Sequence, residues 1–195
     1  MRVIAGSAKG HPLAAVPGDS TRPITDRTKA ALFSILTSAE MVEGKRYLDL
    51  FGGTGAVGIE ALSRDAGEVV FCEKNRAALQ TLRRNLEATG VAERARVIGG
   101  DAFAYLARPD LQPFDVIYIA PPQYKGLWLK ALQLVDARPE LLAPDGFVIV
   151  QIFPKEWSEA ALAHLVETDR RQYGSTALHF LALRSETTVS EDAAP

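Results

Sequence analysis

The sequence predicts an α/β fold with a mostly parallel sheet and helices on both faces. Apolar runs typical of strands alternate along the chain with stretches that repeat apolar residues at helical spacing. Several strand-like runs are apolar at consecutive positions, as in strands buried on both faces of a sheet. The connections are long enough for the helical crossovers that join parallel strands. Because the chain has 195 residues and 47% of them are apolar, we expect one globular domain.

The expected elements run from an N-terminal extension, residues 1–46, through a main domain, residues 47–184, to a flexible acidic tail, residues 185–195. The extension holds a helix through Ala31, Leu32, Ile35 and Leu36, with Thr25 as its cap. Strands are expected at 47–51, 68–73, 95–98, 114–120, 146–153 and 178–184, with 167–173 as one more. Helices are expected around Ile59, Leu62 and Ser63; around Leu79, Leu82 and Leu86 after the cap Asn75; around Leu129, Leu132 and Leu134; and around Ala161, Leu162 and Leu165.

Composition argues against several classes of protein. With 22 Lys and Arg residues against 24 Asp and Glu, the net charge is −2, which is not typical of a general polyanion binder. One cysteine cannot form an internal disulfide, and three histidines leave no Cys/His cluster spaced for structural zinc. No apolar run approaches the ~20 residues of a membrane span, and the start lacks a signal-peptide segment. We therefore expect a cytoplasmic protein without metal or membrane contact.

Basic charge is concentrated at the start of the chain. The first 29 residues contain five basic residues and two acidic ones. The basic residues are Arg2, Lys9, Arg22, Arg27 and Lys29. They form either an ordinary solvated face or a local surface that binds phosphates, since Lys and Arg make most contacts to a nucleic-acid backbone.

A glycine-rich turn follows the first predicted strand. Segment 48–58 runs from an apolar strand through four glycines into a helix, and such a turn lets a ligand approach the backbone closely. Gly53, Gly55 and Gly58 also match the dinucleotide fingerprint G-x-G-x-x-G, with Glu73 twenty residues beyond Gly53. The candidate cofactor-binding residues here are Asp49, Phe51, Gly52, Gly53, Thr54 and Gly55.

Asp49 helps to choose between two classes of cofactor. Its carboxylate would repel the pyrophosphate of a dinucleotide, whereas S-adenosylmethionine carries an ammonium and a sulfonium and no phosphate. Asp49 therefore favours S-adenosylmethionine. Glu73 would accept hydrogen bonds from both ribose hydroxyls of either cofactor, so it does not discriminate. Lys74, beside Glu73, and Thr25 are further candidates for contact with the cofactor.

The turn after the third predicted strand offers Asp101 and Ala102. Asp101 could accept a hydrogen bond from the amino group of adenine. It could equally cap the helix that begins there. The sequence leaves both interpretations open.

A proline-rich turn, residues 120–124, follows the fourth predicted strand. Two prolines fix the backbone, so this turn can present rigid carbonyl acceptors, and Tyr124 offers a ring face for stacking. The alternative is a rigid turn with only a structural role. The candidate catalytic residues are Ala120, Pro121, Pro122, Gln123 and Tyr124.

Two N-terminal blocks carry a specific resemblance. They are Arg2-Val3-Ile4-Ala5-Gly6 with Lys9-Gly10, and Thr21-Arg22-Pro23-Ile24-Thr25-Asp26-Arg27 followed by Ala31-Leu32-Phe33-Ser34-Ile35-Leu36. With these blocks, residues 2–184 resemble the RsmD type of bacterial 16S ribosomal RNA guanine-N2 methyltransferases. The resemblance implies a Rossmann-like class I methyltransferase fold with a seven-stranded sheet, S-adenosylmethionine as cofactor, and a guanine of small-subunit RNA as target.

The chain departs from this family at the proline-rich turn. The family usually has Asp-Pro-Pro followed by an aromatic residue, whereas this chain has Ala120-Pro121-Pro122-Gln123 with Tyr124 one place later. In the family pattern the acid and a backbone carbonyl orient the target amine. Three readings remain: the backbone carbonyls suffice, the Gln123 amide substitutes, or the protein binds cofactor and RNA without efficient turnover.

We therefore expect a monomeric enzyme that methylates the exocyclic N2 amine of a guanine in 16S ribosomal RNA, free or in a small-subunit assembly intermediate. An alternative is a weakened or inactive ribosome-assembly protein that binds cofactor and RNA, which Ala120 would explain. A second alternative is an NAD-dependent Rossmann dehydrogenase. That reading explains Glu73 and the glycines but leaves Asp49, the proline-rich turn and the N-terminal extension unexplained.

Overall fold

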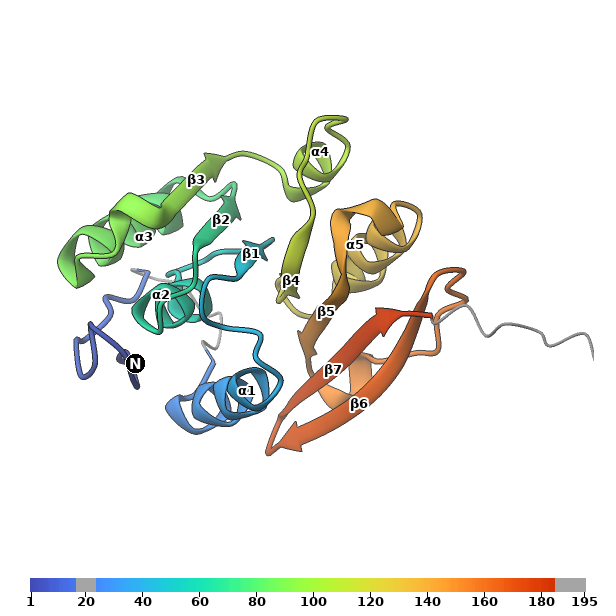
Figure 1. Ribbon diagram of the computed structural model, residues 1–195, viewed down its shortest axis with the longest axis horizontal. Coiled ribbons are helices and arrows are strands. Elements are labelled where there is room, and N and C mark those ends of the chain that lie inside the picture. The colour runs from blue at the N-terminus through green and yellow to red at the C-terminus, as the bar shows by residue number, and fades with distance from the viewer. Residues whose placement is uncertain (17–23, 185–195) are drawn as a thin grey trace, which may run out of the picture.

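A seven-stranded sheet forms the framework of the computed structural model, which describes residues 1–16 and 24–184 (Figure 1). The strand order is β3-β2-β1-β4-β5-β7-β6. The strands are β1 (Arg46–Asp49), β2 (Glu68–Glu73), β3 (Ala95–Gly99), β4 (Phe114–Ile119), β5 (Leu142–Ile152), β6 (Leu165–Tyr173) and β7 (Thr176–Leu183). All seven expected strands are present, so the predicted α/β fold is confirmed.

The sheet is parallel from β3 to β5, and β7 is antiparallel to both β5 and β6. From β1 the chain moves outward to β2 and β3, and it then returns to place β4 on the other side of β1. Strand order therefore reverses between β1 and β4. Open α/β sheets bind ligands outside the carboxyl ends of their strands at such a reversal.

Helices cover both faces of the sheet, as predicted (Figure 1). Alternate strand residues face opposite sides because the side-chain period of a strand is two. Tyr47 and Phe71 pack in one core cluster with α1, α2 and α3, whereas Leu48 and Val70 pack in the other with α4 and α5. The helices are α1 (Asp26–Ser38), α2 (Ala56–Ser63), α3 (Arg76–Thr89), α4 (Ala102–Leu106) and α5 (Leu127–Asp136).

Polar caps fix the start of three helices. The Thr25 hydroxyl accepts the N–H of Thr28 at 3.1 Å, and Asn75 Oδ1 accepts the N–H of Ala77 at 2.9 Å. Asp101 Oδ1 accepts the N–H of Phe103 at 2.9 Å at the start of α4. The predicted caps at Thr25 and Asn75 are confirmed, and Asp101 acts as a cap as well.

The helix expected around Ala161, Leu162 and Leu165 is a wrong prediction, because the chain there is irregular and Leu165 begins β6. The reason lies in Asp136 at the end of α5. Its buried carboxylate accepts three successive backbone N–H groups, at positions 163–165, over 2.8 to 2.9 Å. The backbone N–H groups of this segment are thus bound to Asp136 and not to helical carbonyls. Leu165 is buried in the sheet core, and this tertiary packing outweighs the helical spacing of the apolar residues.

The first residues form a small hairpin that is fixed to α2. The Val3 N–H donates to the His11 carbonyl at 3.0 Å, and the Gly10 N–H donates to the Val3 carbonyl at 2.8 Å. Glu60 of α2 is fully buried, and its carboxylate accepts the N–H groups of Ile4 at 2.7 Å and Ala5 at 3.0 Å. The start of the chain therefore lies against the helix that follows the glycine-rich turn.

Two predicted features, Arg22 and the tail 185–195, lie outside the described residues. Of the helices that the structure describes, none combines the length and the apolar character needed to cross a bilayer.

Candidate functional site

Four turns that the sequence singled out follow β1, β2, β3 and β4, at the same edge of the sheet. Parallel strands place their carboxyl ends together, so these turns surround the point where strand order reverses. The structure therefore brings the predicted cofactor residues at 49–55, 73–74 and 101–102 to the same edge as the proline-rich turn 120–124.

The glycine-rich turn needs glycine for two different reasons. Gly53 and Gly55 have φ angles of +52° and +82°, a region that favours glycine. Gly58 lies on α2, and a Cβ atom added there would come within 2.2 Å of the Phe71 ring on β2. The absence of a side chain at Gly58 thus lets α2 pack closely on the sheet, which fixes the turn that precedes the helix.

Glu73 joins the end of β2 to the glycine-rich turn. Its Oε2 accepts the N–H of Gly53 at 2.9 Å, and its Oε1 accepts the N–H of Asn75 at 2.7 Å. Each carboxylate oxygen can accept a further hydrogen bond, and the side chain is only half-buried. The geometry is therefore compatible with binding of a diol above the turn.

Asp49 is a buried carboxylate at the end of β1. It is 4% exposed, and no described group is hydrogen-bonded to its Oδ1. Burial, with the nearby charge of Glu73, raises the pKa of Asp49 to about 7, although the backbone N–H groups of Gly58 and Phe51 act to lower it. A cation would relieve this unfavourable environment, and a pyrophosphate would aggravate it.

The turn after β3 forms a further border of the site. Lys74 Nζ lies 3.9 Å from Asp101 Oδ2, and both side chains are exposed. Phe51 packs edge-on against Phe103, with 6.2 Å between ring centroids, and Lys130 Nζ lies 4.4 Å from the centroid of Phe103. Phe103 is not among the residues predicted from the sequence. Its position two residues after Asp101 is the one signal that could have pointed to it.

The proline-rich turn presents Tyr124 to solvent. Pro121 is buried, whereas Tyr124 is 70% exposed and has a φ angle of +57°. The Tyr124 N–H donates to Glu156 Oε2 at 2.7 Å, and its ring stacks on Phe153 at 5.7 Å between centroids. Neither partner is among the residues predicted from the sequence, because no candidate site was expected at the end of β5, the strand beside β4.

The prediction that the basic N-terminal residues bind phosphates is wrong for Lys29. Lys29 is 0% exposed, its Nζ lies 3.2 Å from Glu60 Oε2, and it donates to the Arg2 carbonyl at 2.6 Å. Lys29 therefore cannot reach a phosphate in this structure. Arg2, Lys9 and Arg27 are exposed, and Arg2 Nε lies 3.5 Å from Asp26.

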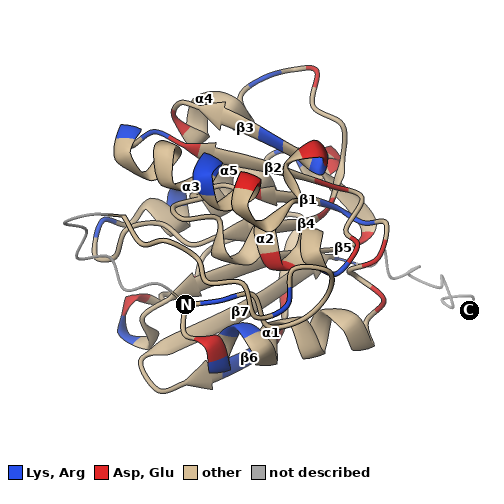
Figure 2. Ribbon diagram, turned by 90° about the vertical axis from the view of Figure 1, so that its left-hand side faces the viewer, with Lys and Arg blue, Asp and Glu red and all other residues tan. Residues whose placement is uncertain are grey.

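Basic residues also occur on α3, a surface that the sequence did not single out. Figure 2 shows Lys and Arg in the N-terminal segment and on α3, interspersed with Asp and Glu. The exposed arginines of α3 are Arg76, Arg83 and Arg84. They offer a second surface on which a phosphate backbone could lie.

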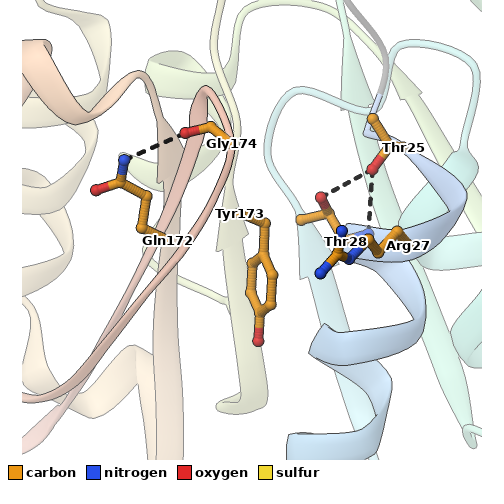
Figure 3. Close-up of a pocket in the computed structure, with 6 residues that line it drawn as sticks. All are labelled: Thr25, Arg27, Thr28, Gln172, Tyr173 and Gly174. Carbon is orange, nitrogen blue, oxygen red and sulfur yellow. Dashed lines mark hydrogen bonds between the residues drawn. The ribbon is translucent and has the colours of Figure 1, made fainter.

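Thr25 lines a pocket of about 260 Å³ between the start of α1 and the β6–β7 hairpin (Figure 3). The other lining residues are Arg27, Thr28, Gln172, Tyr173 and Gly174. The Thr25 hydroxyl lies 2.9 Å from that of Thr28 in addition to its capping bond. None of the lining residues comes from the turns after β1 to β4, so a cofactor contact of Thr25 stays a prediction.

Comparison with known proteins places this arrangement in one family. The family model described as Conserved hypothetical protein 95 matches residues 1–182. The chain belongs to this family. Its relatives include ribosomal RNA small subunit methyltransferase D of Escherichia coli (strain K12), 36% identical over 77% of this chain and 74% of that protein. The predicted resemblance to the RsmD type is therefore confirmed.

Two further comparisons match nearly the whole of this chain. YlbH of Bacillus subtilis (strain 168) is 37% identical over 91% of this chain and 96% of its own length. The solved structure of yhhF from Escherichia coli superposes with a TM-score of 0.81 and 31% identity, covering 94% of this chain and 97% of that chain. The fold is thus the Rossmann-like class I methyltransferase fold, as predicted.

Proposed function

We propose that this RsmD-type protein transfers a methyl group from S-adenosylmethionine to an exocyclic amine of an RNA base. Family membership supports the reaction class, since the Escherichia coli relative is named as a small-subunit ribosomal RNA methyltransferase. The observation that carries the cofactor is the buried Asp49 carboxylate, which lies at the end of β1 before a glycine-rich turn that Glu73 binds. We further propose guanine N2 of 16S ribosomal RNA, free or in an assembly intermediate, as the target.

The strand-end turns fit the chemical groups of S-adenosylmethionine. Glu73 would accept hydrogen bonds from the ribose hydroxyls, Asp49 would neutralise the ammonium group, and Asp101 would accept from the adenine amino group. Phe51, Gly52, Thr54, Gly55, Lys74 and Ala102 would complete the cofactor-binding set. When bound, the cofactor supplies an electrophilic methyl group on a sulfonium.

The protein's main catalytic task is alignment. The amine lone pair would form a bond to the methyl carbon of bound S-adenosylmethionine as the electrons of the carbon–sulfur bond stayed on sulfur, and an amine proton would then pass to solvent. In our proposal the carbonyls of Ala120 and Pro121 accept the amine hydrogens, and Gln123 offers a further acceptor. Tyr124 stacks on a base that is unpaired or extruded from its helix, since a paired amine is poorly accessible.

Calorimetry and a transfer assay test this function. Titration should show binding of S-adenosylmethionine and no binding of NAD. Glu73→Ala should weaken the binding of S-adenosylmethionine by about 1.5 to 3 kcal/mol, because a hydrogen bond to a charged group is lost. Tritiated S-adenosylmethionine should then label unmodified small-subunit RNA, or subunits assembled from it, at one guanine found by mass mapping. Tight NAD binding without a response to S-adenosylmethionine would contradict the proposal.

The absence of an acid from the proline-rich turn favours a second candidate, a protein that binds cofactor and RNA without efficient turnover. Loss of one electrostatic partner typically lowers a rate by ~100 to 1000-fold. If the backbone carbonyls still align the amine, wild type should transfer slowly, and Ala120→Asp should raise the rate without changing cofactor affinity. Gln123→Ala tests the amide as substitute. Binding of both ligands with no transfer by any variant would favour the second candidate.

A further inference from the structure

The segment after β5 holds the exposed ring of the proline-rich turn from two sides. Glu156 Oε2 accepts the Tyr124 N–H at 2.7 Å, so it fixes the backbone of Tyr124. Phe153 stacks on the Tyr124 ring at 5.7 Å with 27° between the planes, so it supports one ring face. Among the residues that the structure describes, no other carboxylate is hydrogen-bonded to the turn 120–124.

This segment is itself anchored to two other elements. Trp157 stacks on His179 of β7 at 3.7 Å between centroids and on Trp128 of α5 at 4.8 Å. His179 and Trp128 are buried, and His179 Nδ1 lies 2.7 Å from Glu167 Oε1 of β6. The aromatic stack therefore fixes the end of segment 153–157, and the segment can act as a rigid support for Tyr124.

Tyr124 needs such a support. Its φ angle of +57° is unfavourable for a residue with a side chain, and such a conformation persists only where surrounding contacts hold it. Tyr124 is 70% exposed, and among the described residues Phe153 is the one aromatic ring that stacks on it. An unsupported ring would sample several rotamers, and a base stacked on it would not stay aligned with the methyl donor.

We propose that Glu156 and Phe153 are positioning residues for methyl transfer: Glu156 sets the backbone of Tyr124, and Phe153 supports its ring from behind the face on which the target base stacks. This inference rests on the proposed function, and it adds two residues from the segment after β5 to a site otherwise built on the turns after β1 to β4. Glu156 Oε1 is buried and has no described partner, so the bond to Tyr124 is the hydrogen bond that the structure gives this carboxylate.

Substitutions at Glu156 separate its hydrogen bond from its charge. Wild-type transfer to unmodified small-subunit RNA is measured first, because its failure would overturn the proposed function and with it this inference. Glu156→Ala should then lower kcat on the order of 10 to 100-fold without changing the Kd for S-adenosylmethionine. Glu156→Gln, whose amide oxygen can still accept the Tyr124 N–H, should keep most of the activity. Glu140→Gln, at the other end of β5, is the matched control.

A double-mutant cycle tests whether Phe153 acts through Tyr124. Phe153→Leu should lower kcat about 10-fold in the wild type and change it little in a Tyr124→Ala background, since a ring that is absent needs no support. Phe147→Leu, within β5 and packed edge-on against Phe180, should leave kcat unchanged in both backgrounds. The inference is overturned if wild type is active and Glu156→Ala has the same kcat, if Glu156→Gln loses as much as Glu156→Ala, or if the effects of Phe153→Leu and Tyr124→Ala simply multiply.

Discussion

Asp49 is a carboxylate whose buried position disfavours its own charge. Burial and the charge of Glu73 raise its pKa from the ordinary 3.8 to about 7. The folded protein therefore binds the proton of this carboxyl more tightly than the unfolded chain does, and ionisation of Asp49 weakens the fold as pH rises from about 4 to 7. Above pH 7 the penalty is complete. A bound cation would lower the pKa again and so remove part of that penalty.

Asp49→Asn should therefore stabilise the ligand-free protein and abolish its response to S-adenosylmethionine. We expect the gain in unfolding free energy over wild type to grow from pH 5 to pH 8, reaching about 1 to 3 kcal/mol, because a buried charge without a full set of partners is removed. Thermal unfolding with and without the cofactor across this range measures both effects. Asp145→Asn, at an exposed position of β5, is the control. A gain that is the same at every pH would contradict the role given to ionisation.

At the scale of elements, the contact between α2 and β2 sets the position of the glycine-rich turn. Gly58 of α2 faces the Phe71 ring so closely that a methyl group at Gly58 would overlap it. The buried ion pair of Lys29 and Glu60 acts at the same helix, since Glu60 binds both α1 and the N-terminal hairpin. Packing and a buried charge pair together hold α2 between the extension and the sheet.

Gly58→Ala should destabilise the protein by about 1 to 3 kcal/mol, as expected for overpacking of a tight core. The shift of α2 should also weaken binding of S-adenosylmethionine, because the turn before the helix moves with it. Phe71→Leu, which creates space, should recover part of the stability of Gly58→Ala. Urea unfolding and calorimetry measure the two effects. Gly100→Ala adds a methyl group where nothing lies within 4 Å, and a comparable loss of stability there would show that space is not the cause.

At the scale of the whole molecule, RNA binding has to be local, because the net charge is −2. The N-terminal residues Arg2, Lys9 and Arg27 remain exposed, whereas Lys29 is an internal cation. The surface of α3 offers a competing set of arginines (Figure 2). The salt dependence of RNA affinity distinguishes these surfaces, since each phosphate contact contributes a slope of about −0.7 on single strands.

Charge reversal of Arg2 together with Lys9 should weaken RNA binding and flatten the salt slope by about 1.4, and it should leave S-adenosylmethionine binding unchanged. Lys29→Met should leave the salt slope unchanged but cost about 3 to 5 kcal/mol of stability, because it breaks a buried ion pair. Fluorescence titration of a small-subunit RNA fragment at several salt concentrations gives the slopes. An unchanged slope after reversal of Arg2 and Lys9, with a loss after reversal of Arg83 and Arg84, would place the RNA on α3.

Local patterns in the sequence were enough to predict the sheet, most helices and the polar caps. Apolar runs at 68–73 and 114–120 mark buried strands because burial on both faces admits few polar residues. Asn75 and Thr25 mark helix starts because their side chains satisfy backbone donors within three residues. The glycine-rich turn and Glu73 could also be predicted as candidate site residues, since both lie at the ends of predicted strands.

The tertiary structure alone decided which distant groups meet. Asp136 accepts the backbone N–H groups at 163–165, so the chain before β6 is irregular where a helix was expected. Lys29 is buried beside Glu60, although the sequence predicted a cation on the surface. The partnership of Tyr124 with Glu156 and Phe153 depends on the adjacency of β4 and β5. Hydrophobic and capping patterns act over a few residues and so appear in the sequence. Buried charges and stacked rings find partners 27 to 32 residues away in these cases, and only the tertiary fold brings them together.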